Sequence, residues 1–271
     1  MEKEKRESII IIINSTAYCL LSYLAVFMLY QLTTIVTSNL YDIPNTLFYN
    51  RIGFNVRPEA WTFDSVKVIF SAGNMILLLS SVSFLVIILK AMEYNGLLRL
   101  FFIWAFIHSV SMLFGSLVLG SFTFEGFGIV LSYLYLEDTA KMILLFIGLI
   151  LIMGIGMAMS KPFLFSANIY YKNLRPSDSP AFRRDQFVLP YFISTLLLLA
   201  LKYPISLYET AILFFPALLL MPLFWGIRRN PVFYFEDSEK SIKISFTLVI
   251  LTLLIIFVYR VLLQKGINIS F

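Results

Sequence analysis

Long apolar runs separated by short polar segments dominate the pattern of the chain. An α-helix rises 1.5 Å per residue, so about 20 apolar residues cross a hydrocarbon core of ~30 Å. The pattern predicts an all-α fold, a polytopic helical membrane bundle of about seven transmembrane helices, with six as the alternative. The expected spans are residues 12–36, 65–89, 97–121, 139–159, 187–201, 208–225 and 244–263.

The boundary between the fifth and sixth spans is the weakest part of this prediction. Lys202, Tyr203 and Pro204 interrupt the apolar pattern there, and a proline disfavours helix at the residue before it. One uninterrupted helix over residues 187–225 would be ~58 Å long, which is too long for a single crossing. We therefore expect two separate spans.

The composition fits a membrane protein and excludes several other classes. Hydrophobic residues make up 59% of the 271 residues and charged residues 14%, and the mean hydropathy is +0.86. A compact soluble fold of this size could not bury so much apolar surface, and disordered chains, coiled coils and disulfide scaffolds have different compositions. We expect one integral membrane domain over residues 1–271 and no separate soluble domain.

The distribution of positive charge predicts the orientation. The net charge is +5, and membrane proteins collect Lys and Arg on the cytoplasmic side. With seven spans and a cytoplasmic N-terminus, the cations expected inside are Lys3, Lys5, Arg6, Lys90, Arg99, Lys161, Lys172, Arg175, Arg183, Arg184, Arg228, Arg229, Lys240 and Lys243. Those expected outside are fewer, namely Arg51, Arg57, Lys202, Arg260 and Lys265. We expect a protein of the inner membrane of a bacterium, with its C-terminus outside, its first apolar run retained as an anchor and no nucleic-acid partner.

Two outer segments each have two interpretations. Residues 37–64 form the longest outer loop, which would be a lid over an outer-facing pocket or, as we favour, an interfacial hairpin. Residues 122–136 carry a single charge, Glu125, and are too short for a further span. They would form a re-entrant segment, with Gly126 and Gly128 supplying turn freedom, or, as we favour, a helix lying flat in the interface.

Membrane lipids are the partners that the sequence indicates. The loop over residues 161–186 holds five cations, and the loop over residues 226–243 mixes Arg228 and Arg229 with three acids. Both loops are expected to contact anionic headgroups, although the positive-inside preference alone would also place such cations there. The sequence does not identify protein partners.

Motifs for catalysis and metal binding are not evident in the sequence. The chain has one histidine, His108, and one cysteine, so the histidine pair of a zinc protease is excluded. Ser116 lies about 12 Å along the helix from His108, out of reach for a serine–histidine dyad. No diaspartyl or nucleotide-binding motif occurs, and we expect neither a metal nor a cofactor.

His108 is the leading candidate for a functional residue, because an ionisable residue inside a span is a functional hypothesis by default. The second and third spans run antiparallel, so its side chain and that of Asn74 could share a polar cavity roofed by residues 122–136. The alternative, which we favour, is a neutral histidine hydrogen-bonded across helices. The candidate substrate-binding residues are His108, Asn74, Ser111, Glu137 and Asp138.

Small residues four positions apart predict where helices pack closely. They occur in the third span at Ser111/Gly115 and Ser116/Gly120, and in the fourth at Gly154/Ala158 and Gly156/Ser160. We assign close packing to Gly115, Gly120, Gly154 and Ala158. The third and fourth spans are expected to pack together at the centre of the bundle.

These observations favour transport or handling of a small or lipidic substrate through a cavity near the third helix. One alternative is a non-catalytic subunit or scaffold of a membrane complex, which needs no pocket. A second is a membrane-embedded enzyme with His108 as general base, which the shortage of catalytic residue types makes the least favoured. A dry, tightly packed His108 would argue against that enzyme.

Overall fold

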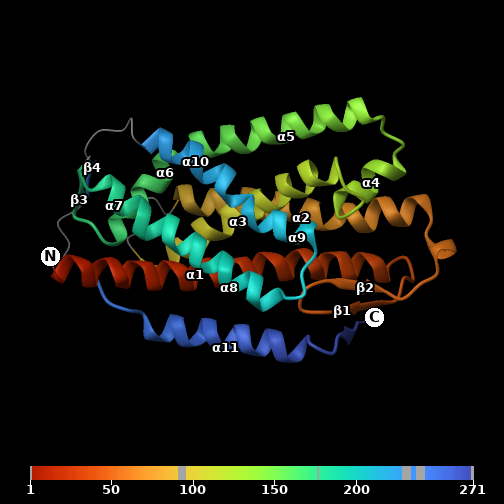
Figure 1. Cartoon of the computed structure of the whole chain (residues 1–271), viewed down its shortest axis with the longest axis horizontal. Helices are drawn as coiled ribbons and strands as arrows, with labels where there is room; N and C mark the ends of the chain where they lie inside the picture. The colour runs from red at the N-terminus through yellow and green to blue at the C-terminus, as the bar shows by residue number, and fades with distance from the viewer. Residues whose placement is uncertain (1, 91–95, 176, 228–232, 236–241, 270–271) are drawn as a thin grey trace.

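A computed structural model of the chain describes residues 2–90, 96–175, 177–227, 233–235 and 242–269. Most of these residues are helical, and the longest helices run side by side along the long axis of the molecule (Figure 1). The predicted all-α class is confirmed. The helices are α1 Glu2–Asn39, α2 Phe63–Lys90, α3 Leu98–Gly120, α4 Phe127–Tyr133, α5 Asp138–Ala158, α6 Ser160–Phe165, α7 Ser179–Arg183, α8 Leu189–Lys202, α9 Leu207–Phe214, α10 Pro216–Ile227 and α11 Phe246–Leu262.

Six helical segments among the described residues are long and apolar enough to cross a membrane, and α11 is a shorter apolar helix. Helices α1, α2, α3 and α5 are four of the six. The fifth, Ser179–Lys202, combines α7, a π-helical turn at Arg184–Val188 and α8, and the sixth, Leu207–Ile227, combines α9 and α10. The fifth and sixth spans are separate, as predicted, and Tyr203 between them has an extended backbone.

The fifth span begins at Ser179, whereas the prediction began it at residue 187. The prediction was based on hydropathy, and the first turns of this span are too polar to be recognised in that way. Within this span, Pro190 removes a hydrogen bond to the carbonyl four residues earlier. That carbonyl, on Gln186, accepts a hydrogen bond of 2.6 Å from Ser15 Oγ, which in turn accepts one of 3.0 Å from Trp104 Nε1. Side chains of α1 and α3 thus provide a hydrogen bond for this carbonyl, which the hydrocarbon of a membrane could not provide.

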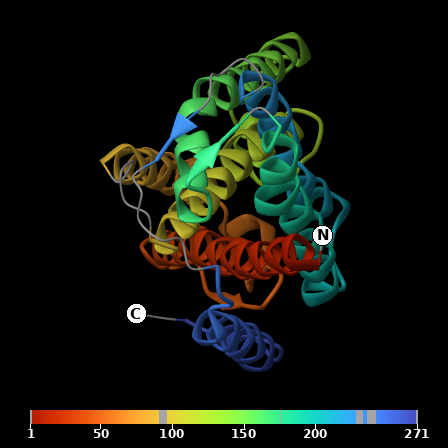
Figure 2. The ribbon, with the colours of Figure 1, turned by 90° about the vertical axis from the view of Figure 1, so that its left-hand side faces the viewer.

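Helix α3 lies at the centre of the bundle. It packs against α1, α2, α4, α5, α9 and α10, and the end-on view of Figure 2 shows it surrounded by other helices. In its apolar window 72% of the residues are buried, against 22% in α5. Helix α5 lies at the edge (Figure 1), so the predicted central position is correct for the third span and wrong for the fourth.

The glycines of α3 pack closely, but against partners other than α5. A Cβ on Gly115 would lie 3.0 Å from the Phe215 ring, and a Cβ on Gly120 would lie 2.5 Å from the backbone nitrogen of Gly128. Their close contacts are therefore with the α9–α10 junction and with α4. Small residues at these positions let neighbouring segments approach the helix backbone.

Helix α5 meets its neighbours through Gly148, which the sequence did not single out, and through Gly156, which belongs to one of the predicted small-residue pairs but was not among the assigned packing residues. A Cβ on Gly148 would lie 2.9 Å from Val118, and Gly156 faces the backbone of α10. Gly154 has nothing within 4 Å and Ala158 is exposed, so the packing role predicted for these two is wrong. Four-residue spacing identifies a stripe of small residues but not the side of the helix that meets a neighbour.

We expect Gly115→Leu to lower the free energy of unfolding by about 1–2 kcal/mol, because the new side chain would overlap the Phe215 ring. Unfolding in detergent, followed by circular dichroism, measures the change. Adding Phe215→Ala to the same chain should recover part of the loss. Wild-type stability for the single variant would contradict this assignment.

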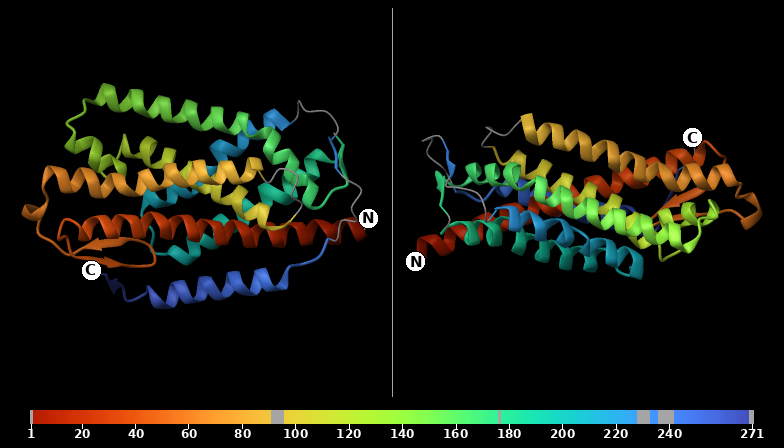
Figure 3. Two further views of the ribbon diagram at one scale, coloured as in Figure 1. Left: turned by 180° about the vertical axis from the view of Figure 1, so that it is seen from behind. Right: turned by 90° about the horizontal axis from the view of Figure 1, so that it is seen from above.

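Two small antiparallel sheets lie at opposite ends of the bundle (Figure 3). At one end, β1 (Asn45–Leu47) pairs with β2 (Ile52–Phe54) and with β5 (Ile267–Asn268). At the other end, near the start of α1, β3 (Asn173–Leu174) pairs with β4 (Phe233–Tyr234). We call these the hairpin end and the N-terminal end. The last described residues lie at the hairpin end, so the two ends of the chain are on opposite sides of the bundle.

Residues 122–136 form part of the bundle wall. Their helix, α4, packs against α2 and α3, and the side chains of Val130 and Leu131 are both 2% exposed. Gly120 and Gly128 bring the backbones of α3 and α4 into direct contact. Whether the segment is re-entrant or interfacial stays a prediction.

Residues 161–186 are packed into the N-terminal end as α6, a 3₁₀ turn, β3 and α7. Arg99, from the start of α3, holds this segment by donating hydrogen bonds of 3.1 Å to the carbonyls of Pro162 and Phe165. Most of residues 226–243, the second segment expected to contact headgroups, lies outside the described residues.

Candidate functional site

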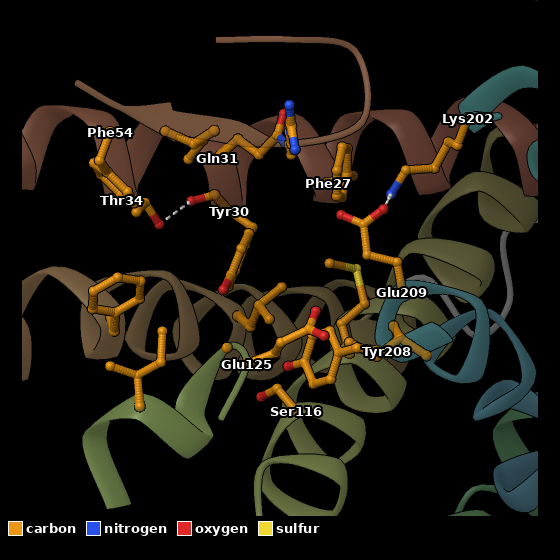
Figure 4. Close-up of a pocket in the computed structure, with 18 of the residues that line it drawn as sticks. Phe27, Tyr30, Gln31, Thr34, Phe54, Ser116, Glu125, Lys202, Tyr208 and Glu209 are labelled. Atoms are coloured by element: carbon orange, nitrogen blue, oxygen red, sulfur yellow. Dashed lines mark hydrogen bonds and ion pairs between the residues drawn. The ribbon is translucent and has the colours of Figure 1, made fainter. Parts of the chain in front are cut away.

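A cavity of about 260 Å³ opens at the hairpin end, between α1, α2, α3, α9, the end of α8 and the two segments that cover it. We call these segments, residues 45–54 and 122–126, the cover. Aromatic rings form much of the wall, from Tyr23, Phe27, Tyr30, Phe54, Phe70, Phe124 and Tyr208. The charged residues of the lining are Arg51, Glu125, Lys202 and Glu209 (Figure 4).

Lys202, the last residue of α8, is a buried cation with three partners. Its side chain is 2% exposed, and its Nζ lies 3.3 Å from Glu209 Oε2. The same Nζ donates a hydrogen bond of 3.3 Å to the Tyr23 hydroxyl and sits 3.7 Å above the centre of the Phe27 ring. A carboxylate, a hydroxyl and a ring face together replace the water that the ammonium has lost.

Glu209 faces the cavity from the first turn of α9. Ser206 is the N-cap of this helix, and its Oγ accepts a hydrogen bond of 3.1 Å from the Glu209 backbone N–H. The Glu209 side chain is 23% exposed, and Figure 4 shows one carboxylate oxygen toward Lys202 and the other toward the open space. A ligand in the cavity therefore has access to the carboxylate but little access to the ammonium of Lys202.

The break between α8 and α9 places this ion pair at the cavity, because it reverses the chain between the two residues. The cover holds the break: Tyr49 OH donates 2.9 Å to the Tyr203 carbonyl, and Asn50 Nδ2 donates 2.7 Å to the Pro204 carbonyl. A third bond of 3.3 Å joins the Ser206 hydroxyl to Glu125 Oε2 on the other part of the cover. Each side of the cover is thus tied to the segment that orients the charges.

Gly126 allows the second part of the cover to close over the cavity. Its φ is +56°, a conformation that L side chains rarely adopt, and the Tyr208 side chain occupies the space a Cβ would need. Tyr208 also lines the cavity. The glycine predicted to give turn freedom at this position therefore does so, and it brings the cover against α9.

The deeper wall of the cavity is polar on two sides. Ser116 of α3 lines it and donates a hydrogen bond of 2.6 Å to Asn74 Oδ1, so Asn74 reaches the cavity through this serine. Gln31 of α1 is 2% exposed, and its side-chain oxygen is buried without a hydrogen-bond partner among the described residues. This amide and the serine are groups to which a ligand could hydrogen-bond.

His108 does not line this cavity. Its Nε2 lies 3.2 Å from the Cys19 carbonyl, and its ring packs against Tyr23 and Trp104 at centroid distances of 5.3 and 5.9 Å. A second void beside it holds only about 10 Å³, roughly the least space that one water needs. His108 is thus a buried residue hydrogen-bonded across helices, as in the favoured alternative, and the cavity shared with Asn74 is not formed.

The remaining predicted site residues are also dispersed. Ser111 is 1% exposed and lines the small void beside His108. Glu137 and Asp138 lie at the start of α5, where Asp138 is exposed and forms an ion pair of 3.4 Å with Lys141. None of these side chains lines the cavity described above.

Sequence reasoning missed the Lys202–Glu209 pair as a site. It treated Lys202 as an interruption between spans, and it placed Glu209 at the beginning of the span over residues 208–225 without proposing it as a site residue. The available signal was two opposite charges on either side of Pro204, each next to an apolar run. Such charges are costly at the edge of a span unless they meet.

The described residues contain no group of three or more His, Cys, Asp or Glu side chains that could hold a metal ion. Comparisons of the chain with protein-family models, with curated proteins and with solved structures give no match.

Proposed function

We propose that this protein binds a small or lipidic amphiphilic substrate in the cavity at the hairpin end and moves or hands on that substrate within the membrane. The observation that carries the proposal is the combination of aromatic walls with an accessible carboxylate, Glu209, in a space of about 260 Å³. Ligand sites are typically apolar concavities with a few convergent polar groups. The volume lies just below the usual range for drug-sized ligands, which favours a small molecule or a single headgroup.

The cover gives this site a means of opening. Arg51 and Phe54 line the cavity from the β1–β2 hairpin, and Phe124 and Glu125 line it from the segment before α4. Movement of either segment would widen access without unpacking α3. Of the two interpretations of residues 37–64, this arrangement supports the lid.

The opposite end of the cavity is closed. Three residues line both the cavity and the small void at His108 and so lie between the two, namely Tyr23, Met112 and Ile212. Transport across the bundle requires this layer to part while the cover closes. The arrangement corresponds to one state of an alternating-access cycle, open at the hairpin end.

The two alternatives fit the geometry less well. A scaffold subunit needs no pocket, whereas a lined cavity with a buried ion pair is present. An enzyme with His108 as general base needs a substrate within hydrogen-bond reach of the imidazole, and the void of about 10 Å³ beside it holds no substrate. Both observations favour substrate binding in the larger cavity.

The test is the binding of three probes with one chain length and different charge: hexylamine, hexanol and hexanoate. A ligand that binds the folded state raises the melting temperature by an amount that grows with the logarithm of the free ligand concentration once this exceeds the Kd. We expect at least one probe to stabilise the purified protein, and Ile212→Trp, which fills the cavity, to weaken its binding by about tenfold or more. Stabilisation is read from the melting temperature in detergent over a probe titration.

The control is Ile250→Trp, a lipid-facing residue of α11 that is 63% exposed. It should leave probe binding unchanged. Equal stabilisation of the wild-type chain and both variants would show that the probe acts through the detergent, and it would contradict the proposed function. The melting temperature of Ile212→Trp without probe shows whether this variant is folded.

A further inference from the structure

A second concave site lies at the N-terminal end of the bundle, far from the cavity and its cover. It is a groove of about 620 Å³ between the start of α1 and the residues that lead into α11. Lys5, Arg6 and Lys243 line it together with apolar side chains that include Ile9, Ile10 and Phe246. No residue of this groove takes part in the proposed function. Lys243 belongs to residues 226–243, which are predicted to contact headgroups, but that prediction names no binding site.

Both walls of the groove change from basic to apolar in the same direction. Helices α1 and α11 start at the same end of the bundle and run parallel (Figure 1). On α1, Ile9 follows Lys5 by one turn. On the other wall Phe246, at the start of α11, follows Lys243 by three residues, and Ile242 precedes Lys243. The cations therefore lie toward one end of the groove, and the apolar side chains apart from Ile242 lie deeper along the bundle.

The two walls are fixed to each other by a buried side chain. Asn14 of α1 is 0% exposed. Its Nδ2 donates a hydrogen bond of 2.9 Å to the Lys243 carbonyl, and its Oδ1 accepts one of 3.0 Å from the Ser245 backbone N–H. The distance between α1 and the start of α11 is thus set by the fold and does not depend on a bound molecule.

The lining of the groove is positively charged, and some of its apolar side chains are exposed. Among the described residues no acid lines it, and Glu4 and Glu7 line a neighbouring concavity shared with Asp178 and Asp185. Ile9 is 48% exposed and Phe246 is 69% exposed. A partner for this surface needs a negative head for the cations and a hydrocarbon chain for the apolar wall.

We propose that this groove binds one anionic phospholipid, with its phosphate at Lys5, Arg6 and Lys243 and an acyl chain along Ile9 and Phe246. Basic side chains at the headgroup level attract anionic lipids, and burial of an acyl chain on the apolar wall adds the hydrophobic contribution. The inference is independent of the cavity at the hairpin end.

The test is lipid binding to the purified full-length chain, measured by native mass spectrometry. The probes are dioleoyl phosphatidylglycerol and dioleoyl phosphatidylcholine, which share acyl chains and differ in charge. The wild-type chain should prefer phosphatidylglycerol, and the triple variant Lys5→Gln/Arg6→Gln/Lys243→Gln should lose about tenfold or more of that affinity. A triple variant that binds phosphatidylglycerol as the wild type does would overturn the proposal.

A matched variant separates a site from general surface charge. Lys161→Gln/Lys172→Gln/Arg175→Gln removes three exposed cations from the same end of the bundle. These cations are expected to contact headgroups only in general, so this variant should lose far less affinity than the triple variant of the groove. An equal loss in this control would mean that any cations attract the lipid, and the groove would not be a site. Free glycerol phosphate should not compete at concentrations where phosphatidylglycerol saturates, since competition would exclude a role for the apolar wall.

Discussion

Replacing Glu209 by methionine is expected to lower the free energy of unfolding by about 3–5 kcal/mol. Lys202 would then be a cation with 2% exposure and no carboxylate beside it. The reverse change, Lys202→Met, should cost less, because the Glu209 side chain is 23% exposed toward the cavity and can recruit water. The measurement is unfolding of each variant in mixed micelles, followed by circular dichroism.

The double variant Lys202→Met/Glu209→Met distinguishes pairing from packing. Removing both members of a buried ion pair is often neutral or stabilising, so the double variant should regain most of the stability lost by Glu209→Met. Asp138→Asn is the control, since the exposed pair with Lys141 should contribute less than about 1 kcal/mol. A double variant as unstable as Glu209→Met would contradict the role assigned to the ion pair.

Gly120→Val is expected to have the second largest effect, a loss of about 3 kcal/mol. Its Cβ would lie 2.5 Å from the nitrogen and 3.0 Å from the Cα of Gly128. Because these are backbone atoms, no rotamer change relieves the overlap, and α4 must move away from α3. Since Ile129 of α4 lines the cavity, the same variant should also weaken binding of the hexyl probes.

Gly154→Ala is the matched control for this prediction. It has nothing within 4 Å of the added Cβ, and alanine is favoured over glycine inside a helix by about 0.5–1 kcal/mol. The variant should therefore be as stable as the wild-type chain or slightly more stable. If Gly120→Val behaved like Gly154→Ala, the close backbone contact of α3 and α4 would be wrong.

Most of the long helices could be placed from the sequence, because a hydrocarbon core requires about 20 apolar residues for each crossing. Six of the seven predicted spans are long apolar helical segments among the described residues, and the seventh, α11, is shorter. The limits of α3 and α5 lie within one residue of the predicted ones at each end, and the break at Tyr203 follows from Pro204. The start of the fifth span could not be predicted in the same way. Its polar first turns are packed against α1, and this packing depends on the tertiary structure.

The candidate site was harder to predict from the sequence. Polar residues within apolar runs can be identified from the sequence, but which of them face one another cannot. His108 and Asn74 are such residues, yet their side chains contact Cys19 and Ser116 and not each other. Lys202 and Glu209 meet only because the chain reverses between them. The orientation of a side chain around its helix axis was the missing information.

The strand β5 has a consequence for how the protein is assembled during translation. Its residue Asn268 accepts a hydrogen bond from Thr46 of β1, a partner 222 positions earlier in the sequence. The hairpin can fold early, but this bond has to wait until α11 has emerged from the ribosome and joined the other helices. The cavity at the hairpin end is therefore among the last parts of the protein to be completed, and in a nascent chain without α11 the β1–β2 hairpin beside it would lack its pairing with β5.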